Sequence, residues 1–143
     1  MASEAQEEQN RDVVGQFFEF YNEHNIESIG QLISSSNYSF HLPGMAPLDW
    51  NTHKQFIAAI ISAFPDFRHN VIDVVAERDK VAVRFNLTGT HKGEFQSIPP
   101  TGKQVSFEGT EFFTIIDGKI VQEWVIVDMI GLLQQLGAIP APP

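Results

Sequence analysis

Hydrophobic and polar positions repeat with two different periods along this chain. Apolar residues recur at helical spacing over three early segments, 11–22, 26–33 and 51–64. A short alternating segment, Tyr38 to Leu42, interrupts them. From about residue 67 onward the period falls to two, which is typical of half-buried strands. The pattern therefore predicts helices and one strand, followed by a set of antiparallel strands.

Turn residues separate the later strands into two hairpins. The expected strands are 67–77, 81–90, 105–116 and 120–128. Asp117-Gly118 between the last two is a strong hairpin signal, and a loop rich in Pro and Gly, 91–103, joins the hairpins. Helices and strands segregated in this order indicate an α+β fold. We expect a cone-shaped domain in which helices pack on the concave face of a strongly curved, mixed or antiparallel sheet and leave a small-molecule cavity.

Length and charge narrow the class of protein. The 143 residues suit one domain, which we assign to residues 11–143 after a flexible polar tail, 1–10. A net charge of −9 disfavours nucleic acid and anionic membranes as partners. Residues 1–10 are polar and acidic, so we do not expect them to form a signal peptide, and no apolar run approaches the roughly 20 residues of a membrane span. Without cysteine it has no disulfide and no thiolate chemistry. We therefore expect a cytoplasmic protein.

Asp128 stands out because it ends an almost continuously apolar strand. Alternation places it on one face with Gln122, Trp124 and Ile126. If that face lines the cavity, Asp128 is a desolvated carboxylate that can act as a general base or acid. Alternatively, Asp128 caps a helix that begins at Met129, where Asp is favoured. The two roles can coexist, and the pattern leaves both open.

The opposite face of the same strand carries Val121, Val125 and Val127. An apolar outer face on a sheet already covered by helices on its other side needs a partner. We expect a homodimer through this outer face.

Other polar residues are candidates for the same cavity. His91 opens the Pro/Gly loop and could shuttle a proton, although an ordinary loop histidine fits its position equally. His41 lies on the polar side of the short strand and could line the cavity, whereas the polar stripe with Arg84 faces either pocket or solvent. The five histidines lack metal-ligand spacing, so we expect no metal site.

Several short motifs of the second half belong together. They are Thr90-His91-Lys92-Gly93-Glu94-Phe95, Ile98-Pro99-Pro100-Thr101-Gly102-Lys103, Asp117-Gly118-Lys119-Ile120-Val121, and Asp128 followed by Gly131-Leu132-Leu133-Gln134-Gln135-Leu136-Gly137. With Phe64-Pro65-Asp66 they resemble the SnoaL-like polyketide cyclase, or ester cyclase, family. The resemblance runs from about Val13 to Pro140.

This resemblance implies the cone-shaped, cystatin-like fold of nuclear transport factor 2 and ketosteroid isomerase, usually as a dimer. It also implies ring closure of a small hydrophobic carbonyl compound by intramolecular aldol condensation, without metal or organic cofactor. Asp128 would be the acid/base and His91 its helper. The expected substrate-binding residues are Trp124, His41, Gln122, Arg84 and Phe112. Non-catalytic binding of a small molecule, or isomerase or hydrolase chemistry in the same pocket, are the alternatives.

Overall fold

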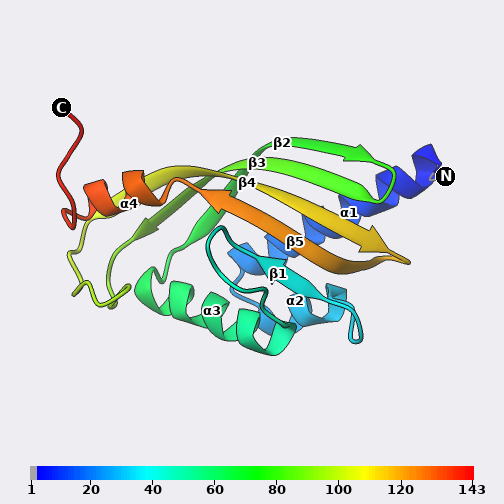
Figure 1. Cartoon of the computed structure of the whole chain (residues 1–143), viewed down its shortest axis with the longest axis horizontal. Coiled ribbons are helices and arrows are strands. Elements are labelled where there is room, and N and C mark those ends of the chain that lie inside the picture. Colours follow the sequence, from blue (N-terminus) through cyan, green and yellow to red (C-terminus); the bar gives the residue numbers. More distant parts are fainter. Residues whose placement is uncertain (1–2) are drawn as a thin grey trace.

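A computed structural model describes residues 3–143 (Figure 1). The helices are α1 (Glu4–Asn22), α2 (Ile26–Leu32), α3 (Trp50–Ala63) and α4 (Met129–Gln135). The strands are β1 (Ser39–His41), β2 (Arg68–Glu77), β3 (Lys80–Thr90), β4 (Gln104–Ile116) and β5 (Lys119–Val127). In this part of the chain no helix is long and apolar enough to cross a membrane.

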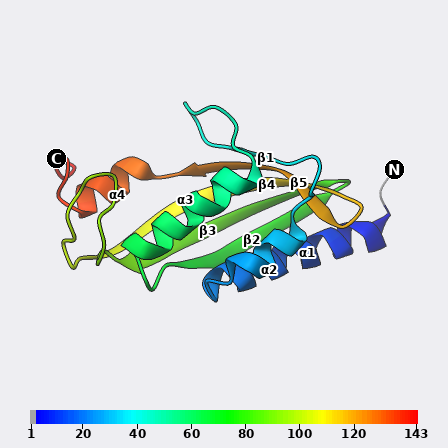
Figure 2. The ribbon, with the colours of Figure 1, turned by 90° about the horizontal axis from the view of Figure 1, so that it is seen from below.

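The strands form one mixed sheet in the order β1-β5-β4-β3-β2. Strands β2 to β5 pair antiparallel with their neighbours, whereas β1 pairs parallel with β5, with Phe40 beside Glu123. Seen from below, α1, α2 and α3 lie across one face of this sheet (Figure 2). The predicted α+β fold, with helices on one face of a mixed sheet, is confirmed.

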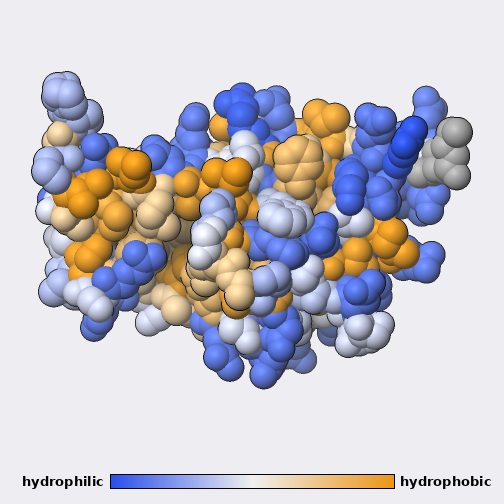
Figure 3. All heavy atoms as spheres, viewed as in Figure 1, coloured by the Kyte–Doolittle hydropathy of each residue, from blue (hydrophilic) through white to orange (hydrophobic). Residues whose placement is uncertain are grey.

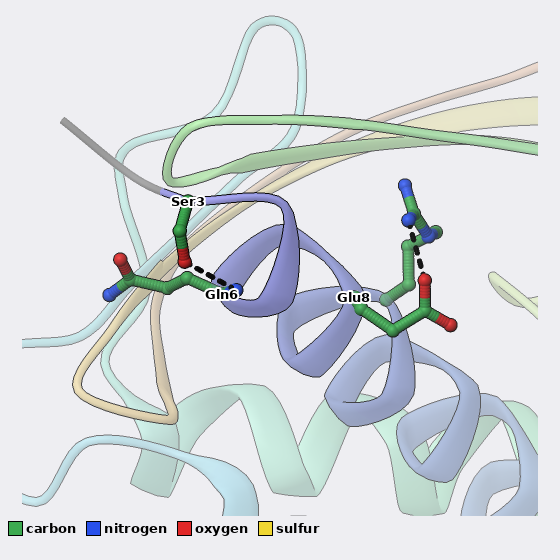
Figure 4. A network of polar contacts seen from close by, with 4 residues as sticks. Ser3, Gln6 and Glu8 are labelled. Atoms are coloured by element: carbon green, nitrogen blue, oxygen red, sulfur yellow. Dashed lines mark hydrogen bonds and ion pairs between the residues drawn. The ribbon is translucent and has the colours of Figure 1, made fainter.

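Helix α1 begins earlier than its apolar pattern suggested. The Ser3 hydroxyl accepts a hydrogen bond from the Gln6 backbone N–H at 3.2 Å and caps the helix (Figure 4). Residues 4–10, expected to belong to a flexible tail, are therefore helical, while residues 1 and 2 of that tail lie outside the described residues. The segment is fixed because Asn10 is buried and its side-chain amide donates to the Arg78 carbonyl at 3.1 Å.

Both predicted hairpins are present. At the β4–β5 turn, Asp117 and Gly118 adopt φ angles of 52° and 76°, the left-handed pair that a tight hairpin turn requires. Just beyond the turn the register shifts, since Ile115 pairs with Ile120 but Thr114 pairs with Gln122. Val121 is thus the extra residue of a β-bulge, and it changes which side of the sheet each later residue of β5 faces.

Aromatic packing joins α1 to the inner face of the sheet. Phe17 and Phe18 on α1 lie edge-on to Phe113 of β4, with ring centroids 5.2 and 5.7 Å apart, and Phe18 also contacts Phe85 of β3 at 5.7 Å. All four rings are buried. Burying each such side chain contributes about 1.5–3 kcal/mol, which holds α1 in place above the sheet.

Strand β5 presents to the cavity the opposite face from the one that carries Asp128 in the sequence pattern. Glu123, Val125 and Val127 point toward the helices, while Trp124 and Ile126 are 51% and 62% exposed. The bulge at Val121 causes the reversal. In the same view as Figure 1, hydrophobic residues form patches on the molecular surface (Figure 3). The homodimer remains a prediction. The exposed apolar side chains on the outer face of this region are Phe112, Trp124 and Ile126, and not the valines named from the sequence.

Candidate active site

A cavity of about 320 Å³ lies between the sheet and the helices. This volume is near the lower end of the range of about 300–1,000 Å³ for small-molecule pockets. Most of its lining is aromatic or aliphatic. The polar side chains that line it are Tyr21, His53, His69, Gln96, Glu111 and Glu123.

Glu111 reaches the cavity because of its place in the alternation of β4. The inward-facing residues on either side of it along the strand are Phe107, Gly109, Phe113 and Ile115, all buried. Glu111 shares their face and is only 3% exposed. A carboxyl group therefore stands where the pattern calls for an apolar side chain, and an unpaired buried charge there would cost several kcal/mol.

Glu123 is the second buried carboxyl group, and it is 1% exposed. It lies on β5 opposite Phe113 of β4, which puts it on the same face as Glu111 and diagonally next to it. The hydroxyl of Tyr38, from the segment before β1, donates a hydrogen bond to Glu123 Oε2. The Tyr38 oxygen lies 2.7 Å from Nδ1 of His53 on α3.

This network fixes where its protons lie. The single hydroxyl proton of Tyr38 goes to Glu123, so the Tyr38 oxygen must accept from His53 Nδ1–H. Burial lowers the pKa of His53, although the nearby Glu123 partly opposes this effect. Burial, with the charge and hydrogen bond of Glu123, raises the pKa of Tyr38. His53 is therefore a neutral donor and Tyr38 keeps its proton, so a chain of hydrogen bonds runs from His53 through Tyr38 to Glu123 Oε2.

Glu111 and Glu123 share a proton. Within residues 3–143, Glu111 Oε2 and Glu123 Oε1 are buried without a hydrogen-bond donor. The pKa of Glu111 is raised well above its ordinary value by burial first, then by the charge of Glu123 and by a hydrogen bond to it. Adjacent carboxyl groups in an apolar site cannot both ionise at ordinary pH. Glu111 is therefore the member of the pair that keeps its proton.

A further polar pair, His69 and Tyr21, lines the cavity. The His69 ring has Phe18, Tyr21 and Phe85 around it, with centroids at 5.0, 4.5 and 5.0 Å. Burial lowers the pKa of His69 to about 3, so the imidazole is neutral. Burial followed by the charges of Glu111 and Glu123 raises the pKa of Tyr21, which keeps its hydroxyl proton available for donation.

Asp128, at the end of β5, is not among the residues that line this cavity, although its neighbours Val127 and Met129 are. Its Oδ1 accepts the Gly131 backbone N–H at 2.9 Å, and the side chain is exposed. The capping alternative is therefore correct, because Asp128 is the N-cap of α4. Its predicted acid/base role remains a prediction, and the position of the side chain outside the lining gives that role no support.

His91 is fully buried, but it too lies outside the cavity lining. Its Nδ1 accepts the Thr101 backbone N–H at 3.2 Å and lies 3.0 Å from the Thr101 hydroxyl. Its backbone N–H donates to the Lys103 carbonyl at 2.9 Å. His91 thus ties together the two ends of loop 91–103, and its predicted catalytic role is likewise untested.

The expected substrate-binding residues gather on the outer face. The rings of His41 and Trp124 stack with centroids 4.0 Å apart, and Phe112 is the cross-strand partner of Trp124. Arg84 donates from Nε to Asp73 at 2.8 Å on the same exterior surface. The half-buried Gln122 is also absent from the cavity lining. These residues do form a neighbourhood, but it lies on the side of the sheet opposite the cavity.

The sequence does carry a signal for Glu111. Val105, Phe107, Phe113 and Ile115 share its parity, so a period-two apolar series contains one acidic interruption. Glu123 has a weaker signal, because apolar residues stand on both sides of its strand. Across residues 3–143, no group of three or more His, Cys, Asp or Glu side chains is arranged to hold a metal ion.

Solved structures of several bacterial proteins share this architecture. AclR from Streptomyces galilaeus, a proposed hydroxylase, is 28% identical, with a TM-score of 0.88 over 96% of this chain and 86% of its own. IdmH from Streptomyces antibioticus, a proposed polyketide cyclase, is 32% identical, with a TM-score of 0.81 over 90% of this chain and 99% of its own. A SnoaL-like protein from Jannaschia is 22% identical, with a TM-score of 0.87 over 98% of this chain and 99% of its own. At this identity the likeness supports the fold alone.

A search of the curated proteins gave no match. The family model described as SnoaL-like polyketide cyclase matches residues 11–136, which is most of the chain. The resemblance carried by the sequence motifs is therefore confirmed, and the chain belongs to the SnoaL-like polyketide cyclase family.

Proposed function

We propose that this protein is a cofactor-independent acid/base enzyme that closes a ring in a small hydrophobic carbonyl compound by an aldol-type reaction. The observation that carries the proposal is the buried Glu111–Glu123 pair in an apolar cavity. Membership of the polyketide cyclase family supports the reaction class. The pair replaces Asp128 and His91 as the proposed chemical groups, because these two side chains do not line the cavity.

Each step uses a group already in place. The carboxylate of Glu123 takes a proton from the carbon next to a substrate carbonyl, and Glu111 donates a hydrogen bond to the developing enolate oxygen. The enolate carbon then attacks a second carbonyl carbon of the same molecule, which forms the new C–C bond and an alkoxide. The proton held by Glu123 neutralises that alkoxide. Protons and charge balance, and both carboxyl groups return to their starting states.

The surrounding residues favour this sequence of steps. The hydrogen bond from Tyr38, backed by His53, holds Glu123 Oε2 in one direction. The apolar walls exclude water and hold the substrate folded, so that the two reacting carbons meet in one molecule. The Tyr21 hydroxyl is a second donor for an oxyanion.

The base assignment is tested with a small ketone. In D₂O, the protein is expected to speed exchange of the α-hydrogens of 2-tetralone, followed by proton NMR. Glu123→Gln should lower this rate at least about 100-fold, because general-base catalysis contributes a factor of that order. Glu108→Gln is the matched control, since it alters an exposed carboxylate on the outward face of β4. It should leave the rate unchanged.

Asp128→Asn separates the two candidate bases. Asn caps helices about as well as Asp, so α4 stays intact in this variant. Loss of exchange in Asp128→Asn, with exchange retained in Glu123→Gln, would assign the base to Asp128. Saturable binding of 2-tetralone without accelerated exchange would instead favour the non-catalytic binding domain.

A further inference from the structure

The cavity carries negative charge without a matching cation. Among residues 3–143, its lining includes Glu111 and Glu123 but no lysine or arginine. The two histidines that line it, His53 and His69, are held neutral by burial. One shared proton is therefore all that offsets two buried carboxyl groups.

We infer that the Glu111–Glu123 pair binds small aromatic amines in their cationic form, with the ammonium group taking the place of the shared proton. The inference rests on the same carboxyl pair as the proposed function, but it concerns the class of ligand and not the reaction.

The hydrogen-bonding capacity of the pair fits an ammonium group. Such a group presents up to three N–H donors. Glu111 Oε2 and Glu123 Oε1 are the buried acceptors that have no donor within the described residues. Charge-assisted hydrogen bonds of this type are about twice as strong as neutral ones. One ammonium can therefore serve both carboxylates.

The walls of the cavity suit the rest of such a ligand. The cavity is lined by Phe17, Tyr21, Phe67 and Phe85. Aromatic faces attract cations, and they also pack against the apolar ring of a ligand. An organic ammonium brings its own apolar body to fill the cavity. A hydrated inorganic cation would have to shed its water for two carboxylates alone, and a carboxylate ligand would meet like charge.

The proton balance gives the inference a distinctive readout. The free protein holds one proton on the pair, and the amine enters as R–NH₃⁺. In the complex both carboxyl groups are ionised around the ammonium, so the shared proton passes to the buffer. Tyr21 and Tyr38 keep their protons because their pKa values are raised, and His53 and His69 have none to lose. The released proton is then that of Glu111.

The test compares three probes with one ring system: 1-naphthylmethylamine, 1-naphthalenemethanol and 1-naphthoate. Binding is measured by titration calorimetry at pH 7 in two buffers with different ionisation heats. We expect the amine to release close to one proton per molecule bound and the alcohol to release none. The amine should bind at least about tenfold more tightly than the carboxylate. Equal affinities for these two charged probes, or amine binding without proton release, would overturn the inference.

Variants tie the readout to the pair. Glu111→Gln should abolish proton release and weaken the amine relative to the alcohol by about tenfold. Retained alcohol binding shows that the cavity of this variant is intact. Glu108→Gln should behave as the unaltered protein, and proton release that persists in Glu111→Gln contradicts the inference. The exchange of 2-tetralone is measured separately, so loss of either result leaves the other proposal standing.

Discussion

The two faces of the sheet hold acidic residues in opposite surroundings. On the outer face, Asp73 pairs with Arg84 at 2.8 Å while their side chains are 60% and 49% exposed. On the inner face, Glu111 and Glu123 lie buried against each other without a cationic partner in the described lining. The outer pair keeps its charge in water and does little else. The inner pair keeps a proton because burial raises the pKa of Glu111, and a pKa perturbed in this way is typical of functional sites.

The largest contrast is expected between two adjacent residues of β4. Phe113→Ala should cost about 3–5 kcal/mol of unfolding free energy, because Phe113 is fully buried against Phe17 and Phe18. Phe112→Ala, at a side chain 54% exposed, should cost less than about 1 kcal/mol. Urea titration of both variants below the concentration of any self-association gives the comparison. Similar costs would show that the outer face is also packed.

The pH dependence of stability should contain contributions from two buried groups of the inner face, His69 and Glu111. The folded pKa of His69 is depressed to about 3, so its contribution is complete above the unfolded pKa of about 6.5 and is lost as pH falls toward 3. The folded pKa of Glu111 is raised, so its contribution is complete below about 4.5 and is lost as pH rises through the folded pKa. Each acts with a limiting slope of about 1.4 kcal/mol per pH unit.

Variants assign the two limbs of that pH curve. His69→Phe should flatten the loss of stability on the acid side, and Glu111→Gln should flatten the loss above about pH 4.5. Urea midpoints measured from pH 3 to 9 provide both limbs. An acid limb that is unchanged in His69→Phe would mean that another group titrates there.

The smallest effect is expected from the outer ion pair. Asp73→Asn should lower the unfolding free energy by less than about 1 kcal/mol, and the difference should shrink further in 1 M salt. Thermal unfolding at two salt concentrations measures it. A cost above about 2 kcal/mol would remove the distinction drawn between the two faces.

The sequence predicted the elements and their order because those depend on local periodicity. The hairpin at Asp117-Gly118 and the apolar stripe of α3 are examples. The inner and outer faces of β5 were not predictable in the same way. Apolar residues stand at both parities, and a single bulge at Val121 decides the outcome.

The candidate site was still harder to predict because it is assembled from distant parts of the chain. Tyr38 and Glu123 are separated by 85 residues, and His53 comes from a helix between them. Their meeting depends on the parallel pairing of β1 with β5, which carries no local signature. Asp128 drew attention because it is a conspicuous polar end of a strand, and helix capping is the ordinary reason for an Asp there.

The bulge at Val121 determines which residues of β5 face the cavity. In the register observed, Glu123 faces inward and Trp124 outward. If Val121 paired with Thr114 and the alternation simply continued from Ile120, an indole would fill the cavity and the carboxylate would point into water. One strand thus encodes two possible linings: one presents Glu123, Val125 and Val127 to the cavity, and the other would present Gln122, Trp124, Ile126 and Asp128. A single unpaired residue selects the first, so a one-residue slip in register would exchange the side chains that line the cavity without any change in composition.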